Sequence, residues 1–172
     1  MIRLVGTVLL STLLLSPLMA SANTLISEPA SCELQQADNP LSLNLALCQQ
    51  LAKLGDANAQ YLLGDYWSAD VQENADLATA ANWYEQASAQ GNAQAQWKLG
   101  QMYMQGQGVH KNLLQAYIIL KMASVNGIDE ALYQADEVAE QMDKRDLLLA
   151  NQILGQVFQS YLAELKTLDS FE

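Results

Sequence analysis

The chain has 172 residues, with 8 basic and 19 acidic side chains and a formal net charge of −11 at neutral pH. This acidic balance argues against nucleic acids and anionic lipid surfaces as partners, because both repel a negatively charged protein. The length is sufficient for one domain with a sizeable hydrophobic core.

Residues 1–22 have the pattern of a secretory signal peptide. Arg3 gives a positive start, residues 4–15 form an apolar run, and a small-x-small site precedes the expected cleavage between Ala22 and Asn23. The alternative is a membrane anchor, but the run is shorter than the roughly 20 residues that a span needs. We therefore expect a periplasmic or secreted protein with no membrane span after cleavage. Because cleavage removes Arg3, the 8 basic side chains become 7 and the net charge becomes −12.

The chain contains two cysteines, Cys32 and Cys48. In the oxidising compartment that export implies, an even pair is usually a disulfide, and this one would be worth about 3 kcal/mol by the loop-entropy model. The alternative is a buried free thiol at Cys48. A metal site is not expected, because His110, the single histidine, lies far off in sequence, and no cofactor is expected either.

Residues 23–39 show little periodicity and are expected to form an irregular lead-in. A helix is predicted from Pro40 to Leu54, because Asn39 can cap it and proline is tolerated at the first helical position. One face of this helix is apolar, formed by Leu47, Cys48, Leu51 and Leu54.

A related sequence then occurs three times at a spacing of 36 residues, in residues 55–64, 91–100 and 127–136. A fixed period of this length is typical of helical repeat proteins. The full units are residues 55–90 and 91–126, and each is predicted to contain a helix A and a helix B. The apolar positions of helix A are Ala59, Leu63 and Trp67 in the first unit and Ala95, Leu99 and Tyr103 in the second.

Helix B of the two units carries matching apolar positions, namely Ala80, Trp83, Tyr84 and Ala87, then Ala116, Ile119, Leu120 and Ala123. Gly64 should let its partner helix approach closely. A third helix A is predicted at about residues 129–141. The segment 143–172 is then expected to contain one long closing helix, over residues 143–165, and a tail.

The helix before the first unit matches a helix B in register. The predicted order is therefore B, A–B, A–B, A and a closing helix. A single helical hairpin cannot bury its apolar face, whereas stacked neighbours can. The sequence thus predicts an all-α fold, a short right-handed α-solenoid over residues 40–142 that is closed by a C-terminal capping helix.

The two full units resemble Sel1-like repeats, which are related to the tetratricopeptide repeat. In the second unit the matching residues are Ala93, Ala95, Gln96, Leu99, Gly100, Tyr103, Gly106, Gly108, Val109, Ala116, Ala123 and Gly127. In the first unit they are Ala57, Ala59, Gln60, Leu63, Gly64, Ala80, Trp83, Tyr84, Ala87 and Gly91. The resemblance implies a non-enzymatic module or adaptor that binds another protein or peptide. In exported bacterial members of the family, this binding takes place in the cell envelope.

Two alternatives follow from relatives of this family. One exported relative is part of the periplasmic ring of sodium-driven flagellar motors, which suggests a structural subunit of an envelope machine. Cysteine-rich relatives have been linked to penicillin binding, which suggests a β-lactam hydrolase or binder. The second alternative is weaker, because those relatives carry a cysteine pair in each repeat, whereas here the single pair lies outside the full units.

The sequence also departs from the family pattern in two places. The first unit has Asp70 and Gln72 where the second has Gly106 and Gly108, so its turn between helices must differ. The third unit has Ala135 and Asp136 in place of the Leu-Gly pair, and its helix B is replaced.

Aromatic residues recur at one repeat position, which we call the aromatic ladder: Tyr61, Trp97 and Tyr133. This ladder could be a peptide-binding groove, since Tyr and Trp are common anchors at interfaces. The favoured interpretation is a packing site between neighbouring helices, since aromatic residues at helical spacing usually fill cores. One turn further on lies a polar row that could recognise a basic or polar partner or could simply be solvated: Asp65, Gln101 and Glu137.

No catalytic residues are predicted. His110 stands beside Lys111 without an identifiable acid or thiol partner. The sequence has no nucleophile elbow, phosphate-binding loop, zinc-protease motif or metal-spaced Cys/His set. We therefore do not expect an enzyme.

Overall fold

A computed structural model describes Cys32 and residues 34–35, 42–43, 45–69 and 76–169 of the chain. The predicted signal peptide with its cleavage site, most of the lead-in, and the turn that contains Asp70 and Gln72 lie outside the described residues.

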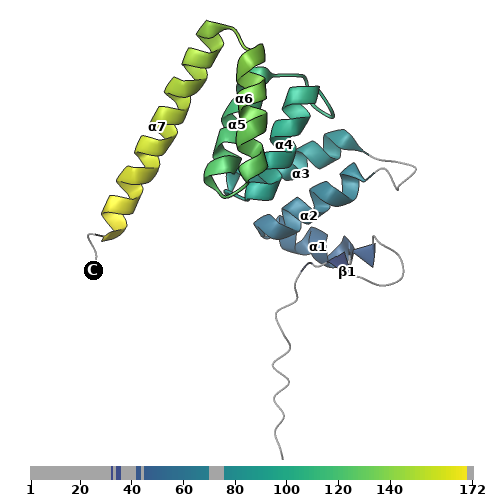
Figure 1. The fold of residues 1–172 in the computed structure, drawn as a ribbon. Coiled ribbons are helices and arrows are strands. Elements are labelled where there is room, and N and C mark those ends of the chain that lie inside the picture. The colour runs from purple at the N-terminus through teal and green to yellow at the C-terminus, as the bar shows by residue number, and fades with distance from the viewer. Residues whose placement is uncertain (1–31, 33, 36–41, 44, 70–75, 170–172) are drawn as a thin grey trace, which may run out of the picture.

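The described part of the chain is a row of α-helices, so the predicted all-α solenoid is confirmed (Figure 1). Each of the first six helices packs chiefly against its neighbours in sequence, as expected of stacked hairpins. The helices are α1 (Leu45–Lys53), α2 (Ala57–Ser68), α3 (Leu77–Ala89), α4 (Ala93–Gln105), α5 (Leu113–Val125), α6 (Asp129–Gln141) and α7 (Lys144–Asp169).

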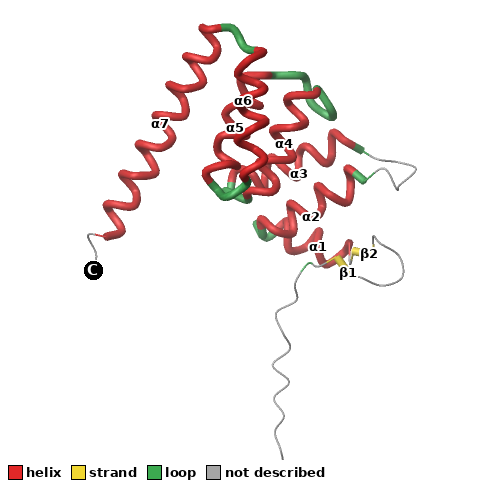
Figure 2. Tube along the Cα trace, in the orientation of Figure 1, coloured by secondary structure: helices red, strands yellow, loops and turns green. Residues whose placement is uncertain are grey.

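Two short strands precede α1, and the sequence did not predict them. β1 (Leu34–Gln35) pairs antiparallel with β2 (Ser42–Leu43), and both lie beside α1 (Figure 2). The helix predicted from Pro40 therefore starts too early, because residues 42–43 are extended and α1 begins only at Leu45. The reason is a pairing between segments seven or more residues apart, which local capping patterns do not reveal.

The predicted disulfide between Cys32 and Cys48 is confirmed, with the two Cα atoms 4.9 Å apart. Both cysteines are buried, in a cluster with Ala52 of α1 and with Leu62 and Leu63 of α2. The bridge therefore fastens the strand-bearing segment to the first layer of the stack.

The helices of the full units begin at side-chain caps that follow the 36-residue period. Asp56 and Asn92 accept hydrogen bonds from the backbone N–H three residues on, at 2.7 and 2.9 Å, at the start of α2 and α4. Asp76 and Asn112 do the same for α3 and α5, at 3.0 and 3.1 Å. Each such cap is worth about 1 kcal/mol, so these residues help to fix where the helices of both units begin.

Two glycines let helix A and helix B of a unit approach closely, as predicted for Gly64. A Cβ atom at Gly64 would collide with the ring of Tyr84, and one at Gly100 would lie 2.7 Å from the Leu120 side chain. The third unit has Asp136 at this position. Asp136 is exposed, with a carboxylate oxygen 3.7 Å from the Lys121 ammonium. The crowded approach of the two full units is therefore absent there.

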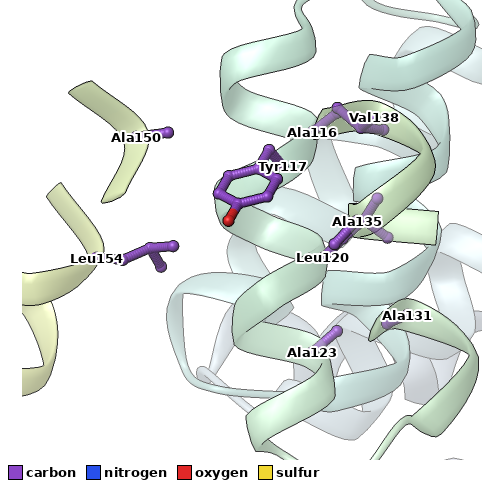
Figure 3. Packing of buried hydrophobic residues seen from close by; sticks show 9 residues of the cluster. All are labelled: Ala116, Tyr117, Leu120, Ala123, Ala131, Ala135, Val138, Ala150 and Leu154. Carbon is purple, nitrogen blue, oxygen red and sulfur yellow. The ribbon is translucent and has the colours of Figure 1, made fainter. Parts of the chain in front are cut away.

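The core consists of three layers along the stack rather than one centre. The first layer joins α1 and α2, the second joins α3 and α4, and the third joins α5, α6 and α7. Figure 3 shows the third layer, where Ala131, Ala135 and Val138 of α6 lie against α5. On the other side of α5, Tyr117 points toward Ala150 and Leu154 of α7 (Figure 3).

The closing helix α7 begins one residue after the predicted position, because Asp143 caps it by accepting from the Asp146 N–H at 2.8 Å. It packs on α5 more than on α6, and the Tyr117 hydroxyl donates to Asn151 Oδ1 at 3.1 Å. Its C-terminal half runs away from the stack (Figure 1). Among the described helices, α7 included, the combination of length and apolar character needed to cross a bilayer does not occur.

Candidate functional site

The aromatic ladder lies on α2, α4 and α6, one residue per helix A, but the three side chains have different surroundings. Tyr61 is half-buried and packs against both the first and the second core layers. Its ring centroid lies 6.1 Å from that of Tyr84, with the rings inclined by 36°. Burial and, to a smaller extent, the nearby Asp65 carboxylate raise the pKa of Tyr61. Tyr61 therefore contributes to packing between layers.

Trp97 joins two neighbouring units. Its half-buried ring packs against the third core layer, and its indole N–H donates to Gln134 Oε1 of α6 at 2.9 Å. Gln101 of the polar row donates to the same oxygen at 3.3 Å. The Lys98 ammonium lies 5.4 Å from the centroid of the Trp97 ring, within range of a cation–π interaction. Trp97 thus helps to fix the position of α6 against α4.

Tyr133, the third member of the ladder, is 72% exposed. In the described part of the chain no further helix A covers it, because α7 leaves the row (Figure 1). The ladder is therefore not a uniform aromatic surface: its first two members are half-buried at the contacts between layers, and its last member faces solvent.

The polar row is similarly uneven. Asp65 accepts a 2.6 Å hydrogen bond from the Tyr84 hydroxyl, which also lies 3.1 Å from the Ser68 hydroxyl. Burial, reinforced by the Asp65 carboxylate, raises the pKa of Tyr84. Gln101 is half-buried, whereas Glu137 on α6 is exposed. Asp65 is thus tied to helix B of its own unit, while Glu137 is open to solvent.

A small polar pocket lies next to Asp65 and Gln101, with a volume of about 170 Å³. Its walls come from α2, α3, α4 and the turn after α4, and they offer hydroxyl, amide and ammonium groups that can bond to a polar group of a ligand. The lining residues are Ser68, Leu77, Tyr84, Lys98, Gln101, Met102, Gln105 and Gln107. Of the residues predicted for the site, Gln101 lines this pocket and Asp65 bonds to its lining residue Tyr84, whereas the ladder residues are not among those that line it.

Two buried glutamines, Gln60 and Gln96, hold adjacent hairpins together, a role that the sequence pattern did not predict. Gln60 donates to the Ala52 carbonyl at 3.0 Å and accepts from Gln90 at 2.7 Å. Gln96 repeats this arrangement 36 residues on, since it donates to the Ser88 carbonyl at 3.2 Å and accepts from Asn126 at 2.8 Å. The shared period of these residues could have revealed the arrangement. Its role is structural.

His110 is exposed, and no cluster of three or more potential metal ligands occurs in the described part of the chain. Partial burial and a 2.7 Å hydrogen bond to Glu85 raise the pKa of Tyr103 to about 12. That tyrosine therefore keeps its proton at neutral pH.

A family model for the Sel1 repeat matches residues 57–92 and 93–127. The chain contains two Sel1 repeats. The matched segments correspond to the two full units expected from the 36-residue period, shifted by two residues at their starts. Sel1 repeats generally mediate protein–protein interaction, and their fold is typically a non-enzymatic scaffold.

Two solved structures with Sel1 repeats resemble this one. The first is c5321, a protective antigen of uropathogenic Escherichia coli strains that displays an SLR fold, with 26% sequence identity and a TM-score of 0.62 over 70% of this chain and 26% of that one. The second is a Sel1 repeat protein from Oxalobacter formigenes, with 33% identity and a TM-score of 0.52 over 55% of this chain and 27% of that one. The chain thus spans about a quarter of the length of each protein.

Proposed function

We propose that this Sel1-repeat protein is an exported, non-enzymatic adaptor that binds a polar peptide segment of another envelope protein. The observation that carries the proposal is the polar pocket between α2 and α4, at the position where the sequence places Asp65 and Gln101. The disulfide between Cys32 and Cys48 supports export, because such bonds persist in oxidising compartments.

The chemistry of the pocket favours a partner with polar groups rather than a purely apolar one. Amide side chains of Gln101, Gln105 and Gln107 can each both donate and accept hydrogen bonds, as a peptide backbone requires. Lys98 adds one positive charge in a chain whose net charge is −11. An acidic or amide side chain of the partner could therefore be accepted at this one point, while the surrounding surface favours basic flanking residues.

A pull-down from a cell-envelope extract tests this function. The double variant Lys98→Ala/Gln101→Ala removes two pocket groups, and Lys111→Ala/Gln115→Ala is the matched control at the exposed start of α5. We expect wild type and control to capture the same protein and the pocket variant to lose it, with unchanged circular dichroism. Capture by all three proteins would contradict the pocket as the binding site. Capture by none would contradict the adaptor role.

A further inference from the structure

The closing helix is much longer than the helix that supports it. α7 has 26 residues and α5 has 13, so their lengths are about 39 and 20 Å at 1.5 Å per residue. Ala150 and Leu154 in its first half are buried against α5. In the second half Phe158 still packs against the third core layer, but the C-terminal end of the helix lies away from the stack (Figure 1).

A groove opens where α7 leaves the stack, with a volume of about 330 Å³. One wall is α7, through Val157 and Phe158, and the opposite wall is formed by the C-terminal ends of α3 and α5, including Met122 and Val125. The walls remain accessible, since Val125 is 64% and Val157 39% exposed. Val157 and Phe158 follow Ala150 and Leu154 on the same side of α7, so they continue the face that the first half buries.

The charge distribution of α7 differs from that of the chain as a whole. Residues 147–163 contain no charged side chain, although the chain carries a net charge of −11. The charges of α7 are confined to its two ends and cancel, with three basic residues, Lys144, Arg145 and Lys166, and three acidic ones, Asp146, Glu164 and Asp169. Depletion of charge is typical of the central part of protein interfaces.

We propose that this groove is covered by α7 of a second copy of the chain, in an antiparallel pairing. The two helices would then place their uncharged middles together, and the Lys144–Arg145 end of each would point toward the Asp169 end of the other. Antiparallel helix dipoles add to this attraction. A two-fold axis makes the contact self-complementary and closed, so the second half of each α7 fills the groove of the other copy. Because α7 is electrically neutral, two acidic chains can meet there with the least repulsion.

Sedimentation velocity and native mass spectrometry of the purified full chain, as its host processes it, test this pairing. The variant Val157→Arg places a charge in the groove, and Val157→Gln tests the same site with an uncharged side chain. The matched control is Leu54→Arg, which replaces another aliphatic residue, 78% exposed, at the opposite end of the stack.

At micromolar concentrations we expect wild type and Leu54→Arg to be dimers, Val157→Arg to be a monomer, and Val157→Gln to dissociate at least tenfold more readily than wild type. Circular dichroism should be unchanged in all variants. A monomeric wild type would overturn the proposal. It would also be overturned if both Val157 variants remained as dimeric as wild type, or if Leu54→Arg dissociated to the same extent.

Discussion

At the scale of single residues, the buried amides Gln60 and Gln96 fix the spacing of neighbouring hairpins. Each one bonds to a carbonyl near the end of the preceding helix and to an amide at the end of the following one. Leu132 occupies the corresponding position on α6 and is 41% exposed, because the next helix, α7, turns away from the row (Figure 1). The arrangement therefore exists only inside the stack.

Replacing Gln96 should destabilise the protein. In Gln96→Leu, Asn126 loses its acceptor and the Ser88 carbonyl loses a donor, so we expect the free energy of unfolding to fall by about 1–3 kcal/mol. Urea denaturation measures this change. Gln94→Leu, at an exposed position of the same helix, is the control and should change the stability little. Equal stability of the two variants would contradict the role assigned to Gln96.

The tyrosine hydroxyls predict how stability depends on pH. Folding raises the pKa of Tyr103 to about 12 and also raises those of Tyr61 and Tyr84, through burial and neighbouring carboxylates. The unfolded chain therefore loses these protons first as the pH rises, since free tyrosine has a pKa of about 10. The stability that the protonated hydroxyls contribute is complete below about pH 10 and is lost progressively above it.

Alkaline denaturation followed by circular dichroism tests this dependence. Tyr84→Phe removes the most deeply buried of the three hydroxyls, so its free energy of unfolding should fall less steeply above about pH 10. Tyr133→Phe, at an exposed position, should behave as wild type. An identical pH dependence of Tyr84→Phe and wild type would argue against this explanation.

At the scale of elements, the close approach of helix A to helix B depends on a missing side chain. In Gly100→Ala the new Cβ would lie 2.7 Å from the Leu120 side chain, so this side chain must shift or α4 and α5 must separate. We expect a loss of about 1–3 kcal/mol. Gly155→Ala is a contrasting control, because no atom lies within 4 Å of its Cβ position. Alanine there should raise helix stability by about 0.5–1 kcal/mol. Thermal melts in which both variants shift the melting temperature in the same direction would contradict this account.

The disulfide is the element-scale constraint at the other end of the stack. Reducing it, or replacing Cys48 by Ser, should lower the free energy of unfolding by about 3 kcal/mol, because the open chain gains conformational entropy when it unfolds. Thermal unfolding with and without a reductant measures the effect. The Cys48→Ser variant should no longer respond to the reductant. If the reductant did not change the melting temperature of the wild type, the bridge would not stabilise the first layer.

At the scale of the whole molecule, the 36-residue period accounts for most of what the sequence predicts correctly. Because the caps Asp56 and Asn92 recur with that period, the starts of α2 and α4 follow from local rules. The strand pair before α1 was missed, since it depends on a contact between separate segments. The direction of α7 was missed as well, because it depends on which face of α5 remains free.

In the candidate site too, local features follow from the sequence, whereas features that depend on contacts between segments do not. The period correctly places Tyr61, Trp97 and Tyr133 on successive A helices, yet it cannot give their exposure, which depends on whether another layer covers each ring. The pocket beside Asp65 and Gln101 also needs the packing of α2 against α4, together with the turn after α4. The sequence therefore predicts on which helix each site residue lies, but not how exposed its side chain is or what surrounds it.

The most direct test of the proposed binding site is photo-crosslinking in the living cell. A photoreactive amino acid is placed at Gln105, an exposed residue of the polar pocket, and at Gln115, an exposed control on α5. We predict a covalent product with one envelope protein from position 105 and none from position 115. No product from position 105, or the same product from both positions, would contradict the claim that the pocket binds the partner.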